Sequence, residues 1–121
     1  MAILDDVTVP DDLLELLERS GFEPNGEWTF AGEHGREWQL APPGTARYVY
    51  FRVHADPQRG LYSIYVEEWR GGEGYEDEEF RGDLGEALAA IPRWAAWARE
   101  PFTPEPSLWQ RCLRWLRGRR D

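Results

Sequence analysis

Hydrophobic residues recur with helical spacing near the start of the chain, in the stretch DDLLELLERS. They form one apolar stripe, made of Leu13, Leu14, Leu16 and Leu17. Asp12 followed by Glu15 has the spacing of a capping box, and Gly21 stands where a helix commonly ends. The pattern predicts an amphipathic helix over residues 11–20.

The hydrophobic period then changes from helical spacing to strict alternation. Trp28 and Phe30 alternate with polar residues, as do Trp38 and Leu40, and the turn formers GEHG lie between the two pairs. We expect a hairpin that pairs Phe30 with Trp38 and Trp28 with Leu40, which would place all four side chains on one face.

A second hairpin follows, in which ARYVYFRVH (46–54) and LYSIYVEEW (61–69) flank the turn ADPQRG. One register satisfies both alternating patterns. It pairs Val53 with Tyr62, Phe51 with Ile64, Val49 with Val66, and, on the other face, Tyr48 with Glu67, Tyr50 with Tyr65, Arg52 with Ser63 and His54 with Leu61.

The stretch RGGEGYEDEEFRG (70–82) is rich in glycine and acid and predicts a loop, with a short extended piece near its Tyr75–Phe80 end. Asp83 and Glu86 have capping-box spacing and open a helix, LGEALAAI. Pro92 is expected to end or kink that helix, and RWAAWARE to continue as a further helical piece.

The end of the chain combines a proline-rich spacer at 101–106 with a last amphipathic helix at 107–121. Residues 1–100 are expected to form one domain to which this basic helix also belongs. The expected fold class is α+β. An N-terminal helix precedes a four-stranded antiparallel meander of two hairpins, and two or three C-terminal helices pack on one sheet face.

The net charge of the chain limits the classes of partner that it can bind. The chain has 14 Arg, no Lys and 23 acids, which gives a formal net charge of -9. Such a chain repels nucleic acid and anionic membrane and is attracted to basic protein surfaces. A single cysteine, and a start without a basic, apolar signal segment, favour a cytoplasmic protein.

The densest charge is the run EGYEDEEF (73–80). One interpretation is a docking surface for a basic partner, in which carboxylates steer and rings anchor; it comprises Glu73, Tyr75, Glu76, Asp77, Glu78, Glu79 and Phe80. Carboxylates on a folded domain can also imitate the phosphates of DNA. The plainer interpretation is a solvated loop that keeps the protein soluble.

The C-terminal segment has the opposite charge. Residues 111–121 contain five Arg and one Asp, so their net charge is +4. An amphipathic helix whose arginines favour its own C-terminal dipole explains this pattern. A contact with RNA or membrane, or a homodimer contact with the acidic face of a second copy, is the alternative interpretation.

The second hairpin offers an alternative ligand face, composed of Tyr48, Tyr50, Arg52, His54, Tyr65, Glu67 and Trp69. Exposed aromatic residues beside arginine are typical of interfaces and of shallow pockets for planar ligands. The same residues could instead be covered by helices or by the first hairpin.

Motifs for catalysis are missing. The chain has no H-x-x-x-H, C-x-x-C, H-E-x-x-H or G-x-S-x-G spacing, and GGEG lacks the lysine of a phosphate loop. Cys112 falls on an apolar helix side, and a His54–Glu67 pair is the one acid–base candidate. We therefore expect no catalytic residue, metal or cofactor.

The sequence thus favours a small acidic protein-binding module. We expect an inhibitor or immunity-type protein that occupies the basic, nucleic-acid-binding surface of an enzyme or defence complex. A small-molecule sensor or enzyme that uses the aromatic face is the first alternative. A structural subunit assembled through contacts between tail and body is the second.

Overall fold

The computed structural model describes residues 9–30, 32–55, 62–70 and 72–100. The elements are α1 (Asp11–Arg19), β1 (Glu23–Phe30), β2 (Glu33–Leu40), β3 (Arg47–His54), β4 (Tyr62–Arg70), β5 (Glu73–Gly82) and α2 (Leu84–Ala98). The strands form one antiparallel sheet in the order β1-β2-β3-β4-β5. The α+β class is confirmed, but the meander has five strands instead of four. The spacer at 101–106 and the helix expected at 107–121 lie outside the described residues.

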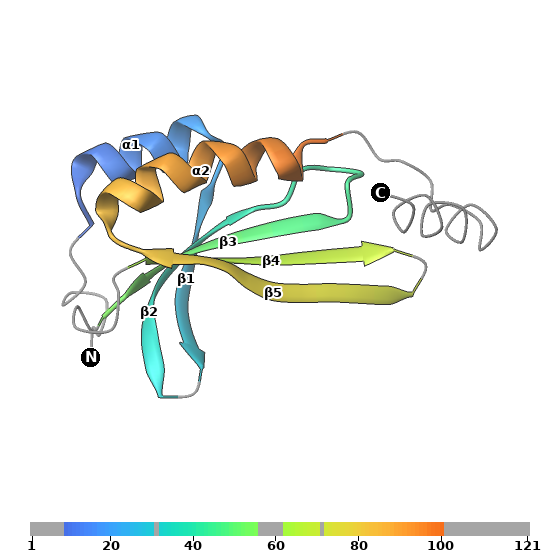
Figure 1. Cartoon of the computed structure of the whole chain (residues 1–121), viewed down its shortest axis with the longest axis horizontal. Coiled ribbons are helices and arrows are strands. Elements are labelled where there is room, and N and C mark those ends of the chain that lie inside the picture. Colours follow the sequence, from blue (N-terminus) through green and yellow to red (C-terminus); the bar gives the residue numbers. More distant parts are fainter. Residues whose placement is uncertain (1–8, 31, 56–61, 71, 101–121) are drawn as a thin grey trace, which may run out of the picture.

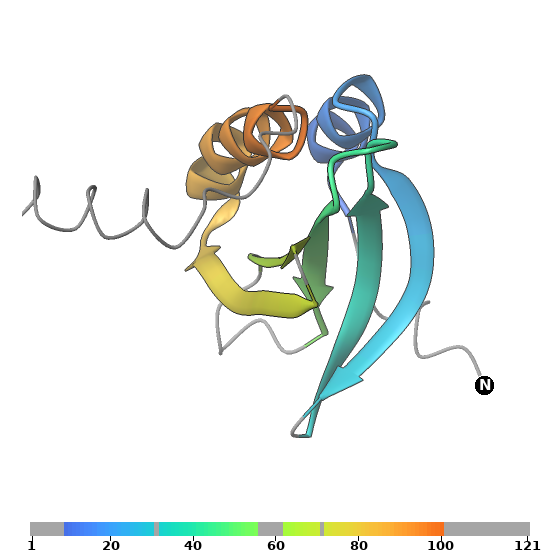
Figure 2. The same ribbon diagram turned by 90° about the vertical axis from the view of Figure 1, so that its right-hand side faces the viewer.

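The two helices lie side by side on one face of the sheet (Figures 1 and 2). Leu13 and Leu17 of α1 are fully buried there, as are Ala87 and Ile91 of α2. The sheet contributes alternate residues of its central strands to the same core, namely Trp38, Leu40, Val49, Phe51, Val53, Tyr62, Ile64 and Val66. We call the other face, which neither helix covers, the open face.

The end of α1 has the geometry that Gly21 predicts. Gly21 adopts φ +92°, its amide donates to the Glu18 carbonyl at 3.0 Å, and the Phe22 amide donates to the Leu17 carbonyl at 2.9 Å. These are the two hydrogen bonds of a Schellman ending. The capping box expected at Asp12 does not form, because the helix begins at Asp11, so that Asp12 lies inside its first turn, and no side chain caps it.

The start of α2 has the predicted capping box. The Glu86 amide donates to the Asp83 carboxylate at 2.9 Å, and the Asp83 amide donates to the Glu86 carboxylate at 3.3 Å. The prediction that Pro92 divides this region into separate helices is wrong, since α2 continues through it to Ala98. Pro92 is exposed, while buried alanines on both sides of it hold the helix on the sheet.

The register of the second hairpin is confirmed at every pair that can be compared, from Tyr48–Glu67 to Val53–Tyr62. The His54–Leu61 pair lies outside the described residues. Alternation specifies this register because the core face carries apolar and aromatic residues from Val49 to Val53 and from Tyr62 to Val66, so a slip of one residue would bury polar groups.

The register predicted for the first hairpin is wrong. Phe30 pairs with Glu33 and Trp28 with Gly35, so β1 and β2 meet closer together in the sequence than predicted, and Gly32 adopts φ +80°. Trp28 therefore lies on the open face, whereas Trp38 packs in the core opposite Phe51. Alternation within each strand is satisfied in either register, so only the turn geometry decides between them.

Two arginines connect the helices: Arg47 connects α2 to the sheet, and Arg99 connects the end of α2 to the end of α1. The Arg47 guanidinium of β3 donates to the Trp97 carbonyl at 2.6 Å and to Glu100 at 2.9 Å, and it also pairs with Glu68 of β4. Arg99 donates to the Ser20 carbonyl at the end of α1, at 2.6 Å. The C-terminal ends of both helices are thereby fixed at one end of the sheet.

Candidate functional site

The acidic run is the last strand of the sheet and one of its two edges. β5 pairs with β4 alone, so residues 73–82 form a full strand where the sequence predicts a loop with only a short extended piece near Tyr75–Phe80. Residues 73–79 are all exposed, and five of these seven are carboxylates. Charged side chains are typical of an edge strand, because they discourage a second chain from pairing with it. Pairing with β4 supplies the extended structure that local propensity does not predict.

Two of the five carboxylates point to the open face. Glu76 lies opposite Glu67, and Glu78 lies opposite Tyr65. The Tyr65 hydroxyl donates to Glu76 at 3.0 Å. Glu78 is bound by Arg81, whose Nε lies 2.9 Å from its carboxylate. The negative charge of Glu78 is thus compensated within the fold.

The other three carboxylates gather around Tyr75 on the helix side of the strand. Glu73 and Asp77 alternate with the open-face residues, and Glu79 is the extra residue of a bulge. The Tyr75 hydroxyl donates to the Glu79 carboxylate, and this hydrogen bond is the largest cause that raises the pKa of Tyr75 to about 12. No arginine of the described residues pairs with Glu73, Asp77 or Glu79.

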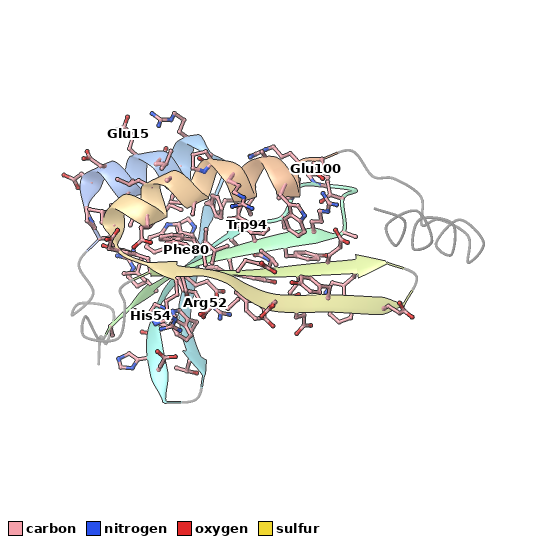
Figure 3. All side chains as sticks on the ribbon, viewed as in Figure 1. Glu15, Arg52, His54, Phe80, Trp94 and Glu100 are labelled. Atoms are coloured by element: carbon pink, nitrogen blue, oxygen red, sulfur yellow. The ribbon has the colours of Figure 1, made fainter. Side chains whose placement is uncertain are left out.

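The exposed rings lie at one end of the β4–β5 hairpin. Among the described residues, the large hydrophobic side chains classed as exposed are Trp69, 44% exposed, and Tyr75, 51% exposed. Trp69 lies against its cross-strand partner Gly74, where a Cβ atom would meet the indole ring at 2.2 Å. Phe80, expected to be an anchor, instead lies opposite Ile64 and packs half-buried against the core (Figure 3).

Arg52 lies at the centre of the open face, on the side of the sheet away from the helices (Figure 3). Its Nε donates to Glu37 at 2.8 Å, and its guanidinium lies over the rings of Trp28 at 4.9 Å and Tyr65 at 4.8 Å. Asn25 donates to the second Glu37 oxygen at 2.7 Å. This arrangement joins the four adjacent strands β1 to β4 and satisfies a carboxylate that is more than nine-tenths buried.

His54 lies between a serine and a glutamate, which is the order of side chains in a serine–histidine–carboxylate catalytic triad. Its Nε2 lies 2.8 Å from the Ser63 hydroxyl, and its Nδ1 lies 3.7 Å from Glu33. Burial, followed by the charge of Arg81, lowers the pKa of His54. Ser63 is fully buried, so its hydroxyl is out of reach of a substrate in this conformation. The structure does not join His54 to Glu67, whose carboxylate instead accepts the Trp69 indole N–H at 3.2 Å.

The two tyrosines of β3 complete the open face. Tyr50 lies opposite Tyr65, with ring centroids 6.2 Å apart, and Tyr48 lies opposite Glu67. Burial, together with the charges of Glu67 and Glu37, raises the pKa of Tyr50 to about 12. The face predicted from the sequence is therefore one surface, but Arg52 and His54 are engaged in contacts within it.

Other kinds of site receive no support from the described part of the chain. It contains no group of three or more His, Cys, Asp or Glu side chains arranged to hold a metal ion. None of its helices is long and apolar enough to cross a membrane. Cys112 and the arginine-rich segment 111–121, with its predicted homodimer contact, fall outside the described residues.

Comparison of the chain with models of known protein families, with curated proteins and with solved structures finds no match. The features that bear on function are therefore the geometry of β5 and of the open face.

Proposed function

We propose that the protein is a protein-binding module that docks the acidic strand β5 on a basic surface of a partner. In its most specific form it is an inhibitor or immunity-type protein that covers the nucleic-acid-binding surface of an enzyme or defence complex. One observation carries the proposal: seven consecutive exposed residues of an edge strand include five carboxylates and no cation. Such a surface attracts basic proteins and repels nucleic acid.

The charge spacing of β5 supports the nucleic-acid-mimic form of the proposal. At about 3.3 Å per residue, the positions 73–79 span about 20 Å and carry one carboxylate per about 4 Å. A DNA strand carries one phosphate per about 3.4 Å of helix axis. A surface that grips a phosphate backbone would meet a similar density of charge on β5. Because the strand is held by its pairing with β4, little ordering entropy would be lost on docking.

The exposed rings and the carboxylates of this surface are suited to different roles in binding. Trp69 and Tyr75 lie at the end of the hairpin where the acidic run begins. Rings of this kind supply buried contact area, while carboxylates raise the association rate and select the partner. Since Phe80 packs against the core, Trp69 takes its place as the second anchor.

The test is affinity capture from a lysate of the source organism with three forms of the full chain. The first is the wild type. The second, the strand variant, combines Glu73→Gln, Asp77→Asn and Glu79→Gln. The third, the control variant, combines Glu18→Gln, Glu23→Gln and Glu27→Gln, three exposed acids on α1 and β1. Both variants change the net charge by the same amount, so they separate local recognition from overall charge.

We expect the wild type and the control variant to retain the same basic protein, released by salt, and the strand variant to lose it. Added wild type should also displace nucleic acid from the purified partner. Equal retention by all three forms, or a partner whose nucleic-acid binding is unaffected, would refute the corresponding part of the proposal.

A further inference from the structure

Two carboxylates face each other across the β4–β5 pair on the open face. Glu67 and Glu76 are direct cross-strand partners, and both are accessible to solvent. Like charges in this position destabilise a sheet, because their Cβ atoms are only about 5 Å apart. Each carboxylate accepts one hydrogen bond from an aromatic residue of β4, from Trp69 at 3.2 Å and from Tyr65 at 3.0 Å.

Aromatic residues surround this pair of carboxylates. Tyr65 and Trp69 flank Glu67 along β4, and Tyr48 lies opposite it on β3. Neither Glu67 nor Glu76 forms an ion pair with an arginine in the part of the chain that the structure describes. The open-face cations have other partners, since Arg52 binds Glu37 and Arg81 binds Glu78 and Glu33.

Two arginines of this protein are each bound by a similar combination of carboxylates and aromatic rings. Arg52 contacts the rings of Trp28 and Tyr65 and binds Glu37, and the same Tyr65 donates to Glu76. On the helix side, Arg47 lies over the Trp97 ring at 4.7 Å and binds Glu68 and Glu100. In both cases a guanidinium is held by carboxylate oxygens and by the face of an aromatic ring.

We propose that Glu67 and Glu76, together with Tyr48, Tyr65 and Trp69, bind an arginine side chain of a partner protein. This proposal builds on the proposed function, since it names the group that a basic partner presents to the open face beside β5. Arginine fits better than lysine because its planar fork of five donors can bridge two carboxylates while it stacks on a ring. A lysine ammonium would interact with the same charges as a compact, strongly hydrated point.

The experiment uses a short blocked peptide with one arginine between glycines, and the matching lysine peptide, as probes of the full chain. Binding is followed by NMR through the Trp69 indole N–H and the amides of Glu67 and Glu76. The arginine peptide should shift these signals and saturate them at a concentration several-fold lower than the lysine peptide. Glu67→Gln, Glu76→Gln and Trp69→Ala should each weaken arginine binding several-fold, whereas Glu27→Gln, at the opposite edge, should not.

A second measurement guards against a merely structural effect. Because the two acids repel each other, Glu67→Gln should leave the fold intact and raise the denaturant midpoint while it weakens peptide binding. Equal affinity for both peptides, the same weakening by Glu27→Gln, or an unshifted Trp69 indole signal would overturn the proposal. Peptide binding requires no natural partner and leaves Glu73, Asp77 and Glu79 unchanged. A negative peptide titration would thus be distinct from a negative result in the affinity capture that tests β5.

Discussion

Arg52 donates a hydrogen bond of 2.8 Å to Glu37 from the neighbouring strand, and both side chains are largely withdrawn from water. Removing the cation alone would leave a buried carboxylate without its charge partner. We expect Arg52→Met to lower the free energy of unfolding by about 3 kcal/mol. Denaturant unfolding followed by tryptophan fluorescence would measure this loss.

The matched control for Arg52 is Arg93→Met on α2, because Arg93 is exposed and, within the described part of the chain, forms no ion pair and lies over the Trp94 ring at 5.6 Å. Its cost should be below about 1 kcal/mol. The double change Arg52→Met with Glu37→Met should recover part of the loss, since no unpaired charge then remains. If both single arginine changes cost the same, the Arg52–Glu37 pair is not the cause.

Gly35 is expected to tolerate no side chain. A Cβ atom there would lie 1.8 Å from the Val53 carbonyl oxygen and 3.1 Å from the Trp28 indole nitrogen. Gly35→Ala should therefore force β2 and β3 apart and lower the free energy of unfolding by about 2–3 kcal/mol. Gly85→Ala is the opposite control, because its Cβ has room in the first turn of α2 and should stabilise the protein by about 0.5–1 kcal/mol. Similar melting temperatures for the two variants would contradict the close approach of β2 to β3.

The two capping-box patterns of the sequence should contribute differently to the free energy of unfolding, because only one of them forms. Asp83 caps α2 through the Glu86 amide, so Asp83→Ala should cost about 1 kcal/mol. Asp12 caps nothing, and Asp12→Ala should change the stability by less than about 0.5 kcal/mol. Thermal or denaturant unfolding of both variants, measured side by side, would test the assignment; equal losses would contradict it.

Comparison of the predicted with the observed strands shows which features the local sequence determines. The β3–β4 register follows from the apolar residues that alternate along both strands, and the co-facial arrangement of Tyr48, Tyr50 and Tyr65 follows from that register. The β1–β2 register does not follow, because Trp28 and Trp38 satisfy alternation in two ways. For β5, the carboxylates oppose strand formation, and only the tertiary pairing with β4 overrides them. Once β5 was expected to be a loop, the inward orientation of Phe80 could not be inferred.

His54 should make the stability depend on pH. Burial, and then the charge of Arg81, lower its pKa in the folded state, while Glu33 and Glu78 act in the opposite direction. The unfolded chain therefore binds a proton more readily as the pH falls through about 6.5. The stability that neutral His54 provides is complete above that pH and is lost below it, with a slope of at most about 1.4 kcal/mol per pH unit.

The test for His54 compares unfolding free energies at about pH 7, 6 and 5 for wild type, His54→Gln and His34→Gln. Wild type and His34→Gln should lose stability more steeply toward low pH than His54→Gln does. Because all three share the same carboxylates, the difference isolates the histidine. Parallel curves for His54→Gln and wild type would show that His54 does not contribute this dependence.

Substitutions on β5 can separate protection of the edge from recognition of a partner. An edge strand is protected by charge of either sign, whereas docking on a basic surface requires negative charge. We compare the strand variant, with Gln, Asn and Gln at positions 73, 77 and 79, with a reversed variant that has Lys at all three. By light scattering, the reversed variant should keep the wild-type mass, and the strand variant should self-associate through an edge that has lost three of its five charges. Both should lose the captured partner.

The control variant with neutral residues at 18, 23 and 27 has the same net charge as the strand variant and should keep the wild-type mass. Self-association of that control would trace the effect to overall charge instead of the edge. Retention of the partner by the lysine variant would show that β5 carries charge only to stay unpaired. In that case the five carboxylates would be explained by the exposed backbone of an edge strand, and the partner would have to contact a different surface of the protein.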